Sequence, residues 1–274
     1  TTIASDKNPN GLKRSQLAWL INGTCRDGGI SPRPSWNLLF PVHPGTALYQ
    51  GGEMYDPQDG SDPYLVVSIG GKIYAVNIIT GAVALLSTTP ALSNPPAVQQ
   101  AYFVQAERFL IIQAGDGVTL PLFWDGNTMR RSHGITGNLT GPNINEIPAA
   151  TAMDYFMGRV WYAQGRNYSA GDIVYGPSGT AAYRQQDSLL KVTENPLCFS
   201  GDGFTPPGGT GNIRAVKHNA NLDAALGQGK LFIFTRKAVF SLSVPVTRND
   251  WTAATQANQP LQTVVQLVNG ATGD

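Results

Sequence analysis

Histidines, cysteines and serines are the side chains of this sequence that could bind a metal or act as nucleophiles. His43, His133 and His218 are far apart, and none has a second histidine or an acidic residue at metal-ligand spacing. We therefore expect all three to be turn or solvent histidines. No serine lies in a Gly-x-Ser-x-Gly motif, and neither Cys25 nor Cys198 has the local signature of a catalytic cysteine. The sequence predicts no catalytic residue, no metal site and no cofactor.

The densest group of carboxylates lies in the run GGEMYDPQDGSDP, which contains Glu53, Asp56, Asp59 and Asp62. Oxygen ligands on such a loop could hold Ca²⁺, but the spacing does not match an EF-hand, whose first ligands occupy alternate positions. We favour an exposed polar turn. A carboxylate pair for glycoside hydrolysis would have to approach within about 5–10 Å across a cleft. The spacing of the acids along the chain does not select such a pair.

Two glycine-rich stretches share the composition of phosphate-binding loops. The stretches SIGGKIY and AGDGVTL are each followed by a strand-like run, whereas a phosphate cradle needs a helix N-terminus at that point. Glycines between β-branched and aromatic runs are typical of tight hairpin turns, which need positive φ angles. We therefore predict hairpins at both stretches and no nucleotide site.

The composition favours a chain of short strands and many turns. The 274 residues include 31 Gly and 19 Pro, only 14% are charged, and the formal net charge is +1. This charge produces no field that would attract nucleic acid or an anionic membrane. The apolar run Leu17–Ile21 is too short for a signal sequence or a membrane span. We predict a protein without a membrane segment.

From Tyr49 onward, a pattern of strands and glycine turns repeats along the chain. The first repeat is a predicted three-strand meander with turns at Gly70-Gly71 and Thr80-Gly81. The four repeats cover Tyr64–Ser87, Arg108–Ser132, Ala152–Gly165 and Gly229–Val244. The final run QTVVQLVNGATGD begins like one more strand.

The spacing of the repeats predicts the fold. The first-turn glycines Gly70, Gly115, Gly158 and Gly229 are 45, 43 and 71 residues apart, and about 45 residues with several strands is the length of a propeller blade. We predict an all-β fold with β-propeller-like meander repeats in residues 49–274, incomplete at its C-terminal end. Residues 1–48 would form an N-terminal arm or capping segment. A β-sandwich is the alternative, because its hairpins also recur at short spacing.

The stretch GLKRSQLAWLINGTCRDGGISPRPSW is similar to the N-terminal stretch of tailed-bacteriophage virion proteins. The matching residues are Leu12, Gln16, Ala18, Asn22, Arg26, Gly28, Gly29, Arg33, Pro34 and Trp36. The later pieces YLVVSIGGKIYAVNIITGAV and LFWDGNTMRRS resemble these proteins in style. The chain departs from the tail-nozzle proteins of short-tailed phages, its nearest functional analogue, because it has no recognisable platform domain.

This resemblance implies a structural protein of a phage virion, located in the tail and assembled in the host cytoplasm. It implies a tail or nozzle ring subunit with propeller-like repeats that helps to form the tube through which DNA is ejected. The partners would be further copies of the chain and other tail proteins. Double-stranded DNA would pass through the ring without base-specific contacts. No enzyme activity is expected.

We expect assembly contacts in the arm, Gly11–Trp36, and in the Gly/Pro-rich loop Gly201–Asn212. The expected contact residues are Arg26, Arg33, Trp36 and Phe204. The run RDGGISPRPSW would form a rigid corner, because two prolines fix φ and two glycines permit the bend. The alternative function is a carbohydrate- or receptor-binding propeller, including a glycosidase, that holds sugar with aromatic residues and the acidic loop Glu53–Asp62. A pocket with two convergent acids and an aromatic platform would favour that alternative.

Overall fold

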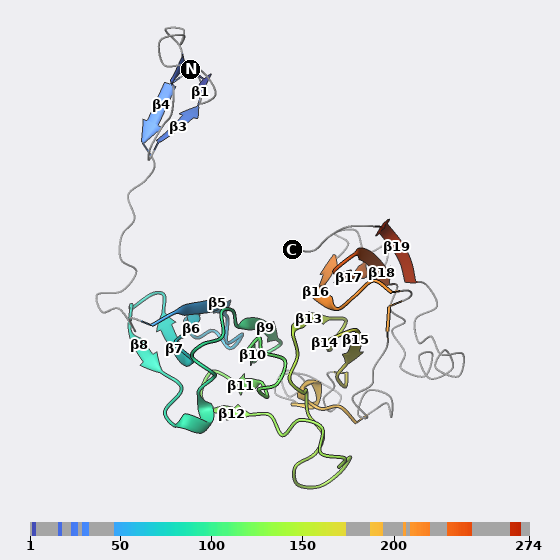
Figure 1. The fold of residues 1–274 in the computed structure, drawn as a ribbon. Coiled ribbons are helices and arrows are strands. Elements are labelled where there is room, and N and C mark those ends of the chain that lie inside the picture. The colour runs from blue at the N-terminus through green and yellow to red at the C-terminus, as the bar shows by residue number, and fades with distance from the viewer. Residues whose placement is uncertain are drawn as a thin grey trace. The chain divides into compact units, whose positions relative to one another are not determined.

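The computed structural model describes residues 47–173, 187–193, 205–206, 209–219 and 229–242, together with five short strands outside these ranges. Contacts between residues divide the chain into two compact units, Thr1–Pro41 and Val42–Asp274. Figure 1 shows the strands of both units.

The N-terminal unit contains two small pairs of strands. β1 (Thr2–Ile3) pairs in parallel with β2 (Gln16–Leu17), and β3 (Gly23–Arg26) pairs with β4 (Gly29–Pro32) as an antiparallel hairpin. Five of the eleven residues of the stretch expected to form a rigid corner therefore lie in strands. A two-stranded sheet consists only of edges, which explains how a strand can end on a proline.

The first sheet of the larger unit is an antiparallel meander of four strands. They are β5 (Tyr49–Tyr55), β6 (Tyr64–Ile69), β7 (Lys72–Asn77) and β8 (Val83–Leu85). Gly70 and Gly71 have φ angles of 57° and 80° and form the tight turn between β6 and β7. The predicted three-strand meander is confirmed, and β5 adds a fourth strand before it.

The second sheet repeats this arrangement. Its strands are β9 (Tyr102–Ala106), β10 (Phe109–Gln113), β11 (Leu122–Trp124) and β12 (Met129–Arg131). Aspartates fix both later turns, because Asp116 Oδ1 accepts hydrogen bonds from the Val118 and Thr119 amides and Asp125 Oδ1 accepts from the Thr128 amide. The predicted hairpin at AGDGVTL, which contains Asp116, is confirmed.

The third and fourth sheets complete the described part of the larger unit. The third consists of β13 (Ala152–Phe156), β14 (Arg159–Gln164) and β15 (Asn167–Ala170). The fourth consists of β16 (Ile213–Asn219), β17 (Lys230–Thr235), β18 (Ala238–Leu242) and β19 (Val264–Asn269). The 3₁₀ turns η2 (Pro90–Leu92) and η4 (Ser188–Leu190) lie in the connections between sheets. The chain is therefore all-β, as predicted.

The repeat length derived from the glycines is wrong, because these glycines occupy different places in their sheets. Gly70 and Gly115 follow the second strand of a sheet, whereas Gly158 and Gly229 precede the second strand. The first strands begin at residues 49, 102, 152 and 213, so successive sheets are 53, 50 and 61 residues apart. A turn glycine indicates that a hairpin is present, but it does not indicate which hairpin of the sheet contains it.

Two hydrophobic cores lie between the sheets, and β10 contributes to both. Leu110 and Ile112 pack with Tyr55, Ile73 and other residues of the first sheet. Phe109 and Ile111 belong to the larger core formed with the third and fourth sheets. Side chains alternate between the faces of a strand, so β10 is buried on both faces. This explains why its first four residues, Phe109 to Ile112, are all apolar.

Candidate functional site

The sequence-predicted contact residues fall largely outside the described residues. Arg26 is the last residue of β3, and its backbone pairs with Gly29. Arg33, Trp36 and Phe204 lie outside the described part of the chain. Their role in assembly stays a prediction.

The acidic run is a turn held by its own carboxylates, as favoured above. Asp56 Oδ1 accepts a hydrogen bond from the Gln58 amide, and Asp59 Oδ1 accepts one from the Ser61 amide, each at 2.9 Å. The hydrogen bonds from Ser61 lower the pKa of the Asp59 carboxyl. Asp56 and Asp59 therefore shape the loop, while Glu53 lies apart from them on β5.

The first strands of the four sheets contact one another in chain order. β5 contacts β9, β9 contacts β13, and β13 contacts β16. Side chains from all four strands line a cavity of ≈ 570 Å³. Its walls are formed by Glu53, Met54, Phe103, Val104, Gln105, Asp154, Tyr155, Phe156, Met157, Lys217 and His218. This cavity is the place in the described residues where polar and aromatic side chains from every sheet converge.

A buried carboxylate connects the third and fourth sheets at this cavity. Asp154 on β13 has 1% of its side chain exposed, and its Oδ1 lies 3.0 Å from Lys217 Nζ on β16. Its Oδ2 accepts a hydrogen bond from the His218 amide at 2.6 Å and lies 2.7 Å from His218 Nδ1. A buried carboxylate is stable only with such partners. Both oxygens are engaged, so Asp154 positions Lys217 and His218.

The ring of His218 is fixed on two sides. Its Nδ1 faces Asp154, and its plane stacks on Phe156 with the ring centroids 5.2 Å apart. A histidine that donates through Nδ1 keeps the other nitrogen, Nε2, as an acceptor. Asp154 and His218 thus form a carboxylate–imidazole pair at a cavity. A nucleophilic Ser, Thr or Cys is not among the residues that line this cavity in the described part of the chain.

The other junctions between sheets carry polar contacts of the same kind. Between the first and second sheets, Gln105 Nε2 donates to the Asp56 carbonyl at 2.6 Å. Between the second and third, Tyr155 Oη donates to Glu107 Oε1 at 2.6 Å. Each of the three junctions is therefore joined by a hydrogen bond from a side chain on or next to a first strand.

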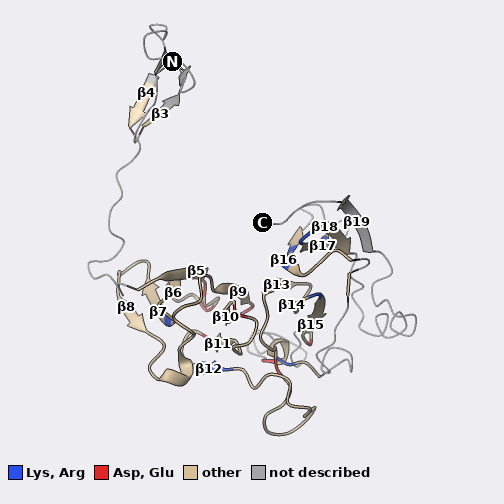
Figure 2. Cartoon of the chain, viewed as in Figure 1, with Lys and Arg blue, Asp and Glu red and all other residues tan. Residues whose placement is uncertain are grey.

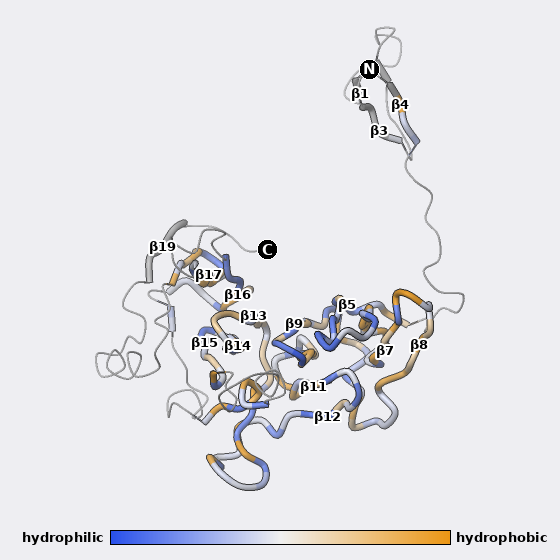
Figure 3. The backbone as a smooth tube through the Cα atoms, turned by 180° about the vertical axis from the view of Figure 1, so that it is seen from behind, coloured by the Kyte–Doolittle hydropathy of each residue, from blue (hydrophilic) through white to orange (hydrophobic). Residues whose placement is uncertain are grey.

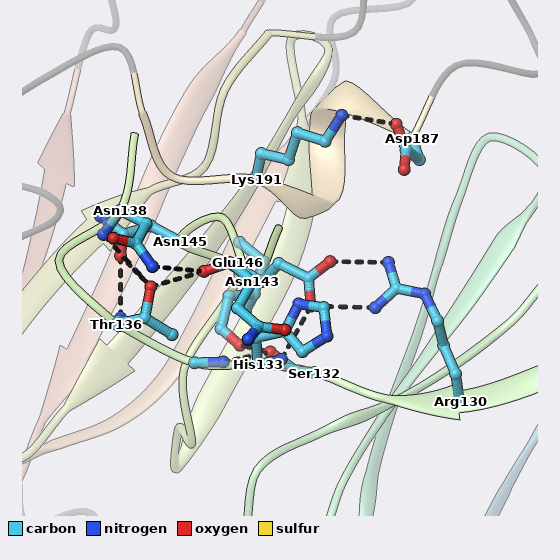
Figure 4. Close-up of polar contacts among 12 residues, drawn as sticks. Arg130, Ser132, His133, Thr136, Asn138, Asn143, Asn145, Glu146, Asp187 and Lys191 are labelled. Carbon is cyan, nitrogen blue, oxygen red and sulfur yellow. Dashed lines mark hydrogen bonds and ion pairs between the residues drawn. The ribbon is translucent and has the colours of Figure 1, made fainter. Parts of the chain in front are cut away.

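A second polar network fixes the connection between the second and third sheets (Figure 4). Glu146 is buried and accepts two hydrogen bonds from the Arg130 guanidinium, at 2.9 and 2.7 Å, and one from the His133 amide at 2.8 Å. Asn145 Oδ1 accepts from the amides of Thr136 and Gly137. These contacts satisfy the backbone of an irregular segment, so we assign the network a structural role.

A second cavity, of ≈ 740 Å³, lies beside the first sheet. Lys72, Leu85 and Arg131 are among its lining residues. Arg131 donates to the carbonyls of Ala91, Ser93 and Leu120. Burial lowers the pKa of Arg131, and the negative charge of Asp116 opposes this effect. Arg131 therefore holds the linker that forms one wall of the cavity.

The expectation that all histidines lie in turns or solvent is wrong for His218, which lies on a strand. One signal in the sequence pointed to its partner: Asp154 is the charged residue inside the apolar strand AMDYF. A charge at such a position needs a partner from elsewhere in the fold. The partner's identity depends on how the third and fourth sheets pack.

Charged residues are sparse along the described ribbon (Figure 2). Within the described residues, no group of three or more His, Cys, Asp or Glu is arranged to hold a metal ion, and no helix is long and apolar enough to cross a membrane. No protein-family model matches this sequence, and no curated protein matches it.

Proposed function

We propose that this chain is a structural protein of a tailed-bacteriophage virion. It acts as a tail or nozzle ring subunit, and its ring forms part of the tube through which DNA is ejected. It is built on β-propeller-like repeats, has no catalytic role and needs no cofactor. The motif in Gly11–Trp36 supports the assignment to phage virion proteins, and the arrangement of the sheets supports the propeller.

One observation carries the propeller proposal: the first strands of consecutive sheets contact one another in chain order. In a propeller, each blade is a four-stranded meander, and the blades are arranged radially around a central channel. The cavity lined by β5, β9, β13 and β16 corresponds to that channel in this proposal. The spacing of 53, 50 and 61 residues between first strands is compatible with one blade per repeat.

The burial of β10 favours a propeller over a sandwich. In a two-sheet sandwich each sheet has one face in the core and the other in water. β10 instead places alternate side chains in two different cores, one toward the first sheet and one toward the third. A blade with a neighbour on either side has this environment.

Exposed apolar side chains support an assembly role. Tyr49 and Ile79 are large, apolar and more than half exposed, and only 14% of the chain is charged. Surfaces of this kind are covered by partners in assemblies. Copies of the same chain and other tail proteins are the partners in this proposal, and the virion tail, assembled in the host cytoplasm, is the location.

Native mass spectrometry of the purified full-length chain, followed by electron cryomicroscopy of the particles, tests this proposal. We expect a closed ring of several copies. A chain that stays monomeric at micromolar concentration, and that does not join purified tail components, contradicts the proposal.

A second candidate function is carbohydrate or receptor binding in the first-strand cavity. Two acids, Glu53 and Asp154, line this cavity and favour this function. The aromatic side chains of Phe103, Tyr155 and Phe156 line the same cavity. The pair Asp154–His218 limits a glycosidase role, because both Asp154 oxygens already have partners. A glycan array with the unmodified chain and with Glu53→Gln tests this function. Binding that is weakened in the variant supports it, and the absence of binding to any glycan rejects it.

A further inference from the structure

An exposed apolar edge runs along the last strand of the first sheet. β8 is the outermost strand of this sheet, and all three of its residues are exposed. Val83 and Leu85 share one face because side chains alternate, and Ile79 in the preceding turn is 69% exposed. The hydropathy colouring marks the same strand as apolar (Figure 3). We call Ile79 and Val83–Leu85 the outer edge. The outer side of an edge strand offers unpaired backbone groups to another strand.

The cavity of ≈ 740 Å³ adjoins one end of the outer edge, because Leu85 is part of its lining. Asn94 also lines it, and Asn94 Nδ2 is buried without a hydrogen-bond partner among the described residues. Buried polar groups of native proteins are nearly always paired. An apolar edge beside a cavity with an unpaired donor is suited to an incoming chain that pairs with β8 and places a side chain in the cavity.

Negative charge adjoins the other end of the outer edge. Asn77 Nδ2 donates to Asp62 Oδ2 at 2.9 Å, and the Ile78 amide donates to the Pro63 carbonyl at 3.3 Å. These bonds hold the acidic loop beside the turn that carries Ile79. Asp56, Asp59 and Asp62 on this loop are all exposed. A partner for this end of the edge should therefore be basic.

The N-terminal unit has the properties of such a partner. Residues 1–41 contain five Lys or Arg and two Asp, a formal charge of +3, whereas the whole chain has only +1. An isolated two-stranded hairpin is marginally stable in water, and chains of about 40 residues usually need an additional contact to be stable. Ile30 on β4 is 51% exposed. A surface that covers Ile30 would stabilise the unit, and its tryptophans Trp19 and Trp36 are candidates for the cavity.

We propose that the outer edge binds the N-terminal unit, residues 1–41, of a second copy of this chain; this unit is the arm from here on. A strand of the arm pairs with β8, its basic residues face the acidic loop, and a tryptophan enters the cavity beside Leu85. Each subunit gives its arm to one neighbour and receives an arm from the other, which is the head-to-tail contact that generates a ring. The inference rests on the proposed ring and adds the contact between its subunits.

Two full-length variants test the contact by complementation. The edge variant carries Val83→Lys and Leu85→Lys, and the arm variant carries Lys13→Glu and Arg14→Glu. Val118→Lys is the control, because Val118 is 80% exposed but lies outside the outer edge. Exposed positions tolerate lysine, and circular dichroism checks that each variant folds. Native mass spectrometry then measures the oligomers of each variant and of the two variants mixed.

We expect the Val118→Lys control to form the same ring as the unmodified chain, and the edge and arm variants to be monomers. Mixing the two should give 1:1 heterodimers, because one intact arm meets one intact edge and the chain of contacts cannot continue. Rings formed equally by both variants overturn the docking site and leave the ring proposal intact. Monomeric variants whose mixture gives no heterodimer also overturn it, since the arm would then act within its own chain. A monomeric unmodified chain instead contradicts the ring itself.

Discussion

At the scale of single residues, the most informative contact is the one between Asp154 and its two partners on β16, Lys217 and His218. A buried carboxylate loses its hydration, and the loss is offset only by charged and hydrogen-bonding partners. Lys217 is 68% exposed, so removing the carboxylate leaves its ammonium in water. Removing the carboxylate therefore lowers the free energy of unfolding through the lost hydrogen bonds and through weaker packing between the third and fourth sheets.

Replacing Asp154 by asparagine should destabilise the chain by about 1–3 kcal/mol, the usual cost of losing buried charge-assisted hydrogen bonds. Urea unfolding measures this change. Asp187→Asn is the matched control, because Asp187 forms a partly exposed ion pair with Lys191 at 2.8 Å, and pairs in contact with solvent contribute less than about 1 kcal/mol. Equal effects of the two substitutions would show that Asp154 does not join the sheets as described.

The turn carboxylate of Asp116 predicts a pH dependence of stability. Partial burial raises the pKa of Asp116, but hydrogen bonds from Thr119 and Val118 outweigh it, so the pKa falls below its ordinary value of 3.8. A carboxyl with a lowered folded-state pKa stabilises the fold above its unfolded-state pKa, and this stabilisation is lost as the pH falls through the folded-state pKa.

We expect Asp116→Asn to be less stable than the unmodified chain at pH 7, by less than about 1 kcal/mol because the side chain is exposed. The difference should shrink as the pH falls below 3.8. Urea midpoints measured from pH 7 down to pH 3 check this. A difference that stays constant over this range would mean that the carboxylate charge is not the cause.

At the scale of elements, the hairpin glycines combine a conformational role with a packing role. Gly71 has a φ of +80°, and a Cβ there would overlap the carbonyl oxygen of Asn94. Gly60 has a φ of +88° but no heavy atom within 4 Å of a Cβ. The two positions therefore share the backbone strain and differ only in the space around the side chain.

Gly60→Ala should cost about 1–2 kcal/mol, the strain of a non-glycine residue at positive φ. Gly71→Ala should cost about 1–3 kcal/mol more, because the methyl group displaces the linker that packs on the turn. Thermal and urea unfolding of both variants check the difference. Equal costs would mean that the linker around Asn94 does not pack on Gly71.

At the scale of the whole molecule, the sheets are stacked so that the second sheet has a core on each side. Leu110 and Ile111 are neighbours in β10, are both fully buried, and belong to different cores. We expect Leu110→Ala and Ile111→Ala each to cost about 2–5 kcal/mol. Val118→Ala, at an exposed position, should change stability by less than about 0.5 kcal/mol. If either β10 variant changes stability as little as Val118→Ala does, the corresponding face of β10 lies in water and not in a core.

The sequence by itself determined the local structure of this protein. Gly70-Gly71, Asp116 and Asp125 mark their turns because positive φ and side-chain capping are set by residues next to the turn. The alternation of apolar runs and turns was sufficient to predict an all-β chain. Asp56, Asp59 and Asp62 were predicted to lie in a polar turn for the same local reason, whereas Glu53 of that run lies on β5.

Only the tertiary structure decided which residues meet. The pairing of Asp154 with Lys217 and His218 joins positions that are 63 and 64 residues apart in the sequence. The correct repeat, counted from first strand to first strand, and the two-sided burial of β10 also depend on how the sheets pack. A turn or a strand is specified by neighbouring residues, whereas the packing of one sheet against the next depends on contacts distant in the sequence. For that reason the sequence predicted the strands. The structure was needed to find the cavity lined by the first strands of the four sheets.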